Sequence, residues 1–181
     1  HEQNMQKMGG LKQYMPITYW TMFIAALASS GVPGFSGFFS KDAIIEAVHF
    51  ANIPGAEFAY FCVLTTVFVT ALYTFRLIFM TFHGQPRMDS HTKEHLHESP
   101  WVVTLPLVVL AIPTVISGWF IGSIVFGDYF ANAIYIASAH DAIEKLRVEF
   151  TGIGGMMIHA LSTAPFWLSV AGIFTAWFLY S

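Results

Sequence analysis

Charged residues and cysteines are scarce in this sequence, and both shortages restrict what the chain can be. Asp, Glu, Lys and Arg make up 10% of the 181 residues, whereas hydrophobic residues make up 55%. Soluble domains contain about 25% charged residues, so the composition excludes an ordinary soluble domain. The one cysteine, Cys62, cannot form a disulfide within the chain and is expected to pack as a small apolar side chain. The net charge of -3 and the scattered basic residues exclude a nucleic-acid-binding domain.

Four long stretches of the chain carry no charged side chain. They cover residues 13–40, 58–75, 99–127 and 150–181. About 20 apolar residues in a helix cross roughly 30 Å of hydrocarbon, so each stretch is about long enough to span a bilayer. The sequence therefore predicts an all-α, polytopic membrane helix bundle with about four spans, the first one discontinuous. We expect an entry loop at 1–15, a broken helix at 16–50, spans at about 58–82, 101–126 and 157–180, and an interfacial amphipathic segment at 128–149.

The ends of the sequence suggest a longer parent protein. The chain starts at His1, without an initiator Met or a signal-peptide pattern, and stops inside an apolar helix at Ser181. We therefore expect a single transmembrane fragment of a larger membrane protein.

The first apolar region has to contain a break. As one straight helix from Ile17 to Phe50 it would be about 51 Å long, more than the bilayer requires. Three glycines and a proline interrupt it at Gly31-Val32-Pro33-Gly34-Phe35-Ser36-Gly37. We expect a half-helix at about 17–30, unwound backbone at about 31–39, and a second half-helix at about 40–50 with Ser40 as its N-cap.

The basic residues of the short loops predict the orientation. Lys7 and Lys12 lie in the loop before the first span, and Arg87 and Lys93 lie in the loop at 83–100, whereas the loop at 51–57 has neither Lys nor Arg. Cytoplasmic loops are enriched in Lys and Arg. We expect the first half-helix to start at the cytoplasm and the second to end outside.

Lys41 and Asp42 are the strongest candidates for chemistry. They follow the break directly, at the expected start of a half-helix deep in the membrane, where an ionisable side chain costs about 2.5 to 3.5 kcal/mol and usually faces protein or water. Broken transporter helices handle ions at such breaks. Desolvation and the helix N-terminus favour a neutral Lys41 amine, and the Asp42 carboxylate favours the ammonium, as a proton relay requires. The structural alternative is a Lys41–Asp42 pair that only caps the helix.

For each of the other polar side chains, a structural role stands as an alternative to a functional one. Asp42, Glu46 and His49 share one face of the second half-helix, which could be a titratable exit path or a solvated helix end. Arg76 and His159 lie alone in apolar spans, and a structural role is the expectation for each. His83, His91, His95 and His97 invite a metal site, but they lie in a charged loop without cysteine, so we expect no metal.

Several motifs resemble one family. They are Lys7-Met8-Gly9-Gly10-Leu11, Met15-Pro16-Ile17-Thr18, the break continued through Phe38-Phe39-Ser40-Lys41-Asp42, and Tyr73-Thr74-Phe75-Arg76 with Phe82-His83-Gly84. Together they resemble the antiporter-like subunit L of proton-pumping NADH:quinone oxidoreductase, respiratory complex I. The resemblance rests on motifs over about residues 1–84, and on hydropathy and span order beyond them.

The resemblance implies a C-terminal portion of that subunit, starting before its broken twelfth helix. Lys41 matches the terminal lysine of the family's buried proton path, and Asp42 matches the aspartate that leads to the outer aqueous phase. Where the family commonly continues Lys-Asp-Glu-Ile, this sequence has Ala43, so that glutamate's role does not carry over, and whether Glu46 replaces it stays open.

The family also implies partners and a location. The chain would be a subunit of an oxidoreductase and translocase without a redox centre of its own. NADH, FMN, iron-sulfur clusters and quinone would bind partner subunits, other membrane-arm subunits and lipid would surround the chain, and the location would be the bacterial inner membrane. The alternatives are a large subunit of a multisubunit cation/proton antiporter or membrane-bound hydrogenase, and a purely structural membrane module.

Overall fold

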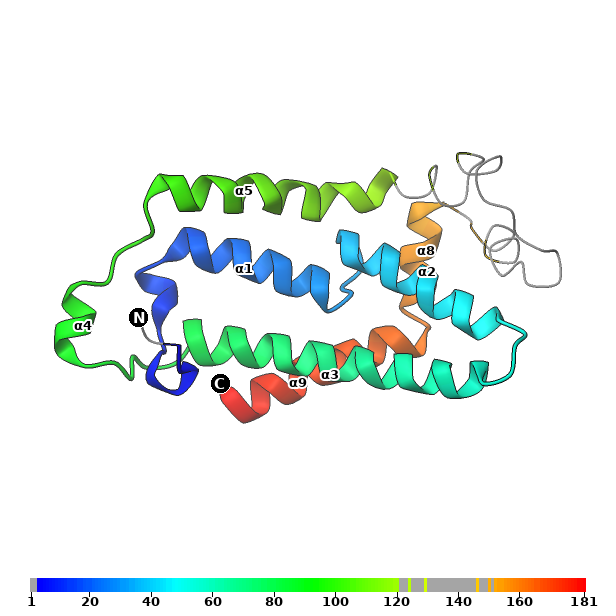
Figure 1. Ribbon diagram of the computed structural model, residues 1–181, viewed down its shortest axis with the longest axis horizontal. Coiled ribbons are helices and arrows are strands. Elements are labelled where there is room, and N and C mark those ends of the chain that lie inside the picture. Colours follow the sequence, from blue (N-terminus) through cyan, green and yellow to red (C-terminus); the bar gives the residue numbers. More distant parts are fainter. Residues whose placement is uncertain (1–2, 121–123, 125–128, 130–145, 147–149, 151) are drawn as a thin grey trace.

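The computed structural model describes residues 3–120, 124, 129, 146, 150 and 152–181, and every regular element among them is helical (Figure 1). The α-helices are α1 (Pro16–Ser29), α2 (Ser36–Phe50), α3 (Ala56–Phe82), α4 (Ser90–Glu94), α5 (Trp101–Ile116), α8 (Ile153–Ala160) and α9 (Ala164–Tyr180). Short 3-10 helices are η1 (Met5–Lys7), η2 (Leu11–Gln13) and η3 (Ser117–Phe120). The all-helical bundle with a broken helix is confirmed, whereas the predicted segment at 128–149 lies almost wholly outside the described residues.

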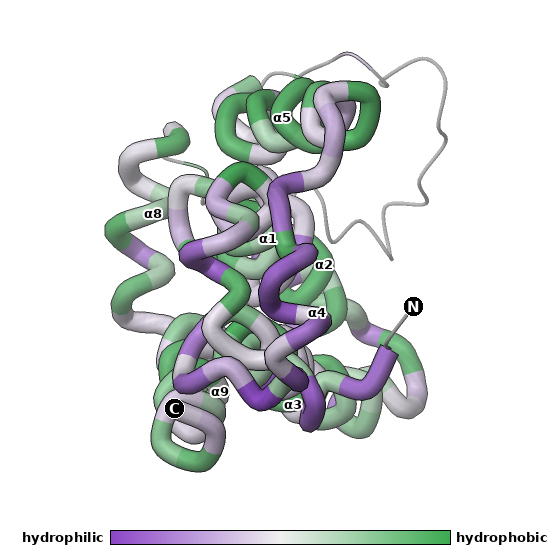
Figure 2. The backbone as a smooth tube through the Cα atoms, turned by 90° about the vertical axis from the view of Figure 1, so that its left-hand side faces the viewer, coloured by the Kyte–Doolittle hydropathy of each residue, from purple (hydrophilic) through white to green (hydrophobic). Residues whose placement is uncertain are grey.

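The long apolar helices match a membrane protein. Among the described residues, α3 and α5 with η3 are each long and apolar enough to cross a bilayer, and α1 is a shorter apolar helix. Helices α8 and α9 pass the same criterion together but are bent by 61° at the break between them, where the sequence predicts one span at 157–180. Hydrophilic residues gather around α4 and the N-terminus at one end of the molecule, and α3, α5 and α9 are mostly hydrophobic (Figure 2). The chain is therefore an integral membrane protein.

The two halves of the first, broken helix are packed in separate cores. Tyr19 and Ala26 of α1 are buried with Phe75, Ile78 and Phe82 of α3 and Ala176 of α9. Phe38 and Phe39 of α2 are instead buried with Met156 and Ala160 of α8. Between membrane helices such contacts stabilise the fold through van der Waals packing, so each half is held by a different set of neighbours.

The break itself is shorter than the sequence predicts. Helix α1 ends at Ser29 and α2 begins at Ser36, so residues 36–39 are helical where unwound backbone was expected. Phe39 is fully buried, and its packing with Phe38 against α8 extends the helix backward beyond Ser40. Ser40 is not the N-cap: its hydroxyl donates to the carbonyl of Gly37, 3.3 Å away within the first turn of α2.

A distant glutamate caps the start of α1. Pro16 occupies the first helical turn, and Met15 before it offers no side-chain cap. The Glu98 carboxylate accepts hydrogen bonds from the amide of Ile17 at 2.6 Å and from the hydroxyl of Thr18 at 2.7 Å. The loop that precedes α5 therefore holds the N-terminus of α1, a contact between residues 80 positions apart.

We expect Glu98→Gln to destabilise the protein by about 0.5 to 2 kcal/mol, the usual loss for a helix cap. Burial raises the pKa of the Glu98 carboxyl, but hydrogen bonds from Thr18, Ile17 and Ser99 outweigh it and hold that pKa below its usual range. A depressed folded-state pKa gives stability that is present above the unfolded value of about 4.3 and is lost as the pH falls through the folded value. Thermal unfolding in detergent micelles, followed by circular dichroism across this pH range, measures the difference.

The matched control is Glu94→Gln, the same change at an exposed position of α4. It should leave both the unfolding temperature and its acid dependence unchanged. Equal behaviour of the two variants would show that Glu98 does not cap α1.

Candidate functional site

Two helix breaks meet at the centre of the site. The hydroxyl of Ser169 on α9 donates a hydrogen bond of 2.7 Å to the carbonyl of Ser30, the first residue of the break between α1 and α2. A pocket of about 20 Å³ lies here, lined by residues that include Ser30, Lys41 and Asp42 and, at the α8–α9 bend, Thr163. That volume holds about one water molecule. The Ser30 carbonyl lies at the break, and it thus receives its hydrogen bond from the other bent span. Backbone groups in a membrane interior require such partners.

Lys41 connects the two halves of the broken helix. Its ammonium donates to the carbonyl of Ser29, the last residue of α1, and its stem passes close to Gly31. Unsatisfied carbonyls give a helix C-terminus a partial negative charge, which attracts a cation. The expected placement at the first positions of a half-helix was wrong, because α2 starts five residues before Lys41. The cation therefore lies at the carbonyl end of α1 and not at the amide end of α2.

Asp42 is a buried carboxyl group with an unused oxygen. Its side chain lies in the second turn of α2 and is 4% exposed. Within the part of the chain that the structure describes, its Oδ2 has no hydrogen-bond partner, and no ion pair joins it to Lys41. A buried carboxyl oxygen without a partner calls for a water molecule or a proton. The structural alternative, a Lys41–Asp42 ion pair, is not what the geometry shows.

A larger cavity opens from Asp42 along the polar face of α2. It has a volume of about 400 Å³, and Asp42, Glu46 and His49 line it from α2. Tyr60 of α3 and His159 of α8 line its other sides. The ring of His49 packs against Tyr60, with a centroid separation of 4.8 Å. The structure thus places all four residues named from the sequence in one region, with Lys41 beside the narrow pocket and the other three along the cavity.

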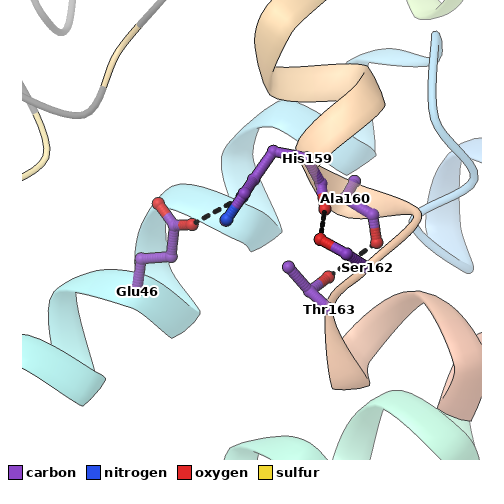
Figure 3. A network of polar contacts seen from close by, with 5 residues as sticks. All are labelled: Glu46, His159, Ala160, Ser162 and Thr163. Atoms are coloured by element: carbon purple, nitrogen blue, oxygen red, sulfur yellow. Dashed lines mark hydrogen bonds and ion pairs between the residues drawn. The ribbon is translucent and has the colours of Figure 1, made fainter.

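Sequence reasoning missed the part played by α8. His159 Nδ1 lies 3.9 Å from Glu46 Oε1, and Figure 3 shows the two side chains facing each other across the gap between α8 and α2. A lone histidine in an apolar span predicts nothing about its neighbour 113 positions earlier. Only the bend between α8 and α9, which brings His159 to α2, makes the pair.

The histidines of the segment from α3 to α5, His83, His91, His95 and His97, lie at the opposite end of the bundle (Figure 1). The rings of His91 and His95 are in contact, with centroids 4.9 Å apart, but the described residues contain no group of three or more potential metal ligands. His83 Nε2 is 3.2 Å from the hydroxyl of Tyr19. Burial and then the nearby Lys12 lower the pKa of His83, which favours its neutral form.

The sequence matches two family models and a set of curated proteins. Residues 1–81 match "NADH:quinone oxidoreductase/Mrp antiporter, TM", and residues 73–163 match "NADH dehydrogenase subunit 5 C-terminus". NADH-quinone oxidoreductase subunit L of Neisseria meningitidis serogroup B is 46% identical over 99% of this chain and 29% of its own length. Subunit L of Rhodobacter capsulatus is 40% identical over 77% of this chain and 21% of its own.

A eukaryotic relative shows the same relation. NADH-ubiquinone oxidoreductase chain 5 of Chondrus crispus is 34% identical over 99% of this chain and 27% of its own length. The chain thus spans less than a third of the curated relatives that it matches. These relatives are subunits of NADH-quinone and NADH-ubiquinone oxidoreductases, and the two family models together cover residues 1–163 of this chain. The chain belongs to the family of NADH:quinone oxidoreductase subunit L and chain 5.

Proposed function

We propose that this chain is part of a proton-translocating membrane subunit of an NADH:quinone oxidoreductase, in which Lys41 and Asp42 transfer protons at a helix break. The observation that carries the proposal is the environment of these two side chains. A buried carboxyl with an unpartnered oxygen adjoins a lysine at the carbonyl end of α1, and both line a pocket that accommodates a water molecule.

The geometry supports a simple sequence of proton movements. The carbonyl of Ser29 holds the Lys41 ammonium in place, and a water in the pocket is in position to take its proton. Asp42 then accepts the proton on a carboxyl oxygen that has no hydrogen-bond donor among the described residues. From Asp42 the cavity along α2 leads past Glu46 and His49 toward the end of the bundle away from α4. Lys41 is half-buried, and the surrounding protein can drive the removal of its charge, because one pKa unit is about 1.4 kcal/mol.

The redox chemistry belongs to other subunits in this proposal. NADH, FMN, iron-sulfur clusters and quinone bind partner subunits, and quinone reduction there drives the charge changes at Lys41. The chain then acts as a translocase without a redox centre, packed between other membrane-arm subunits. Its relatives in Neisseria and Rhodobacter are bacterial, which supports a location in the bacterial inner membrane. The expected orientation is supported by Lys7, Arg87 and Lys93, whose segments lie at one end of the bundle (Figure 1).

Lys41→Met in the complete subunit separates proton transfer from a scaffold role. We expect the oxidoreductase to assemble and to lose most of its proton pumping per NADH oxidised, because methionine keeps the stem but carries no proton. Native gels verify assembly, and proton uptake into inverted membrane vesicles measures pumping. Lys93→Met, the same substitution in the polar loop at α4, is the matched control and should pump normally. Unchanged pumping by an assembled Lys41→Met complex would leave the chain as a structural module.

A further inference from the structure

We propose that His159 of α8 is a further proton-carrying residue of this site, and that it receives the proton leaving Asp42. The proposal rests on the function proposed above, because it adds the next group to the same path. It assigns a role to the bent pair α8–α9, which the sequence alone predicts to be an ordinary membrane helix.

The first observation is the meeting of His159 with α2. His159 lies in the last turn of α8, and its Nδ1 is 3.9 Å from the Oε1 of Glu46. That distance is short enough for an ion pair when the imidazole is protonated, yet too long for a direct hydrogen bond. The Glu46 side chain is 24% exposed, so it is largely withdrawn from solvent and can stabilise a nearby positive charge.

The second observation is the cavity that joins Asp42 to His159. Its volume of about 400 Å³ is far more than one water molecule needs, and its lining is rich in polar groups. The titratable groups that face it are Asp42, Glu46 and His49 from α2, Tyr60 from α3 and His159 from α8. Waters in such a cavity can connect the unpartnered Asp42 oxygen to the imidazole without any direct contact between the two side chains.

The third observation is how the bend exposes the histidine to this cavity. Helix α8 stops at Ala160, and the hydroxyls of Ser162 and Thr163 donate to the carbonyls of His159 and Ala160 at 2.6 and 2.8 Å (Figure 3). The freed backbone is thus satisfied locally, and the imidazole remains directed toward Glu46. The ring also lies at the carbonyl end of α8, where a positive charge is favoured.

The proton balance of the step is simple. Neutral Asp42 breaks its O–H bond and becomes a carboxylate, a water chain passes the proton on, and a new N–H bond converts the imidazole of His159 to imidazolium. The Glu46 carboxylate compensates the new charge. The imidazolium then releases a proton to water at the outer side and returns to its neutral form. No electrons move, and histidine suits the step because its imidazole can both accept and donate a proton through its ring nitrogens.

His49 lines the same cavity, but its surroundings differ. Its ring is packed between aromatic neighbours, with centroids 4.8 Å from Tyr60 and 5.5 Å from Phe50. His159 instead faces a carboxylate. The geometry therefore favours His159 as the group that takes up charge.

The test uses His159→Gln and His159→Arg in the complete subunit within the assembled oxidoreductase. Glutamine removes proton exchange, and arginine keeps a permanent positive charge beside Glu46. We expect both to slow proton transfer by about 10²-fold, the usual effect of losing one acid–base group. His91→Gln, the same change in the exposed α4 loop, is the control and should pump normally. A structural cation would instead be rescued by arginine, and that result would overturn the proposal.

Chemical rescue separates this proposal from the function on which it rests. The cavity has room for free imidazole, so we expect millimolar imidazole to restore pumping to His159→Ala and not to Lys41→Met. Normal pumping by assembled His159→Gln, with Lys41→Met inactive, would overturn the role of His159 and leave the Lys41–Asp42 proposal intact. Normal pumping by Lys41→Met would overturn the proposed function whatever the His159 variants do.

Discussion

Arginine at position 41 should lower proton pumping per NADH about as far as methionine does, although it preserves the positive charge. A guanidinium does not lose its proton at any accessible pH, so Lys41→Arg can still donate to the Ser29 carbonyl but cannot take part in proton exchange. Pumping is measured in inverted membrane vesicles whose content of assembled complex has been verified.

The opposite outcome has an equally clear physical basis. If Lys41 serves only to satisfy the carbonyl end of α1, arginine supplies the missing donor and methionine does not. Methionine would then leave a carbonyl unpaired at a cost of about 1 to 3 kcal/mol, which would appear as reduced assembly. Near-normal pumping by Lys41→Arg together with poor assembly of Lys41→Met would therefore defeat the relay.

Gly37→Ala should be strongly destabilising, although helix propensity alone predicts the reverse. Alanine in place of glycine stabilises a helix interior by about 1 kcal/mol. A Cβ at Gly37, however, would clash with the carbonyl oxygen of Ala28, across the break between α1 and α2. The atoms nearest to that Cβ are all backbone atoms of Ala28, so the two half-helices would have to separate. We expect the net loss to reach or exceed the roughly 1 to 3 kcal/mol typical of overpacking.

The measurement is the thermal stability of the purified protein and the yield of assembled complex. Gly154→Ala is the control, because Gly154 is also helical but a Cβ there would meet no atom of the described residues within 4 Å. It should be neutral or slightly stabilising. If Gly37→Ala behaves like Gly154→Ala, the close approach of α2 to α1 does not contribute to stability.

The sequence predicts this fold best where local chemistry decides the structure. The second predicted span, 58–82, corresponds closely to α3, because a long apolar run forms a helix in a membrane so that its backbone groups are satisfied. The break after α1 was also predictable, since glycine and proline interrupt a helix wherever they occur together. The extent of the break was not predictable, because the burial of Phe38 and Phe39 against α8 depends on residues more than 100 positions away.

Long-range contacts limited the prediction of the site in the same way. Lys41 and Asp42 were identifiable because ionisable residues are costly beside a break in an apolar helix. The hydrogen-bond acceptor of Lys41, the Ser29 carbonyl, was not identifiable, since it depends on where α1 ends. Glu98 at the start of α1 and His159 beside Glu46 are each brought into place by tertiary structure, and neither position carries a sequence motif.

The hydrogen bond from Ser169 to Ser30 makes the two bent spans mechanically dependent on each other. If residues 30–35 rewound and joined α1 to α2 in one rod, the Ser30 carbonyl would turn back into its own helix and release Ser169. The bent pair α8–α9 would then lose this stabilising hydrogen bond to the rest of the bundle. In the path proposed above, a rearrangement of the break beside Lys41 would therefore also disturb the bent pair that carries His159, so that uptake and release of a proton would depend on one shared contact.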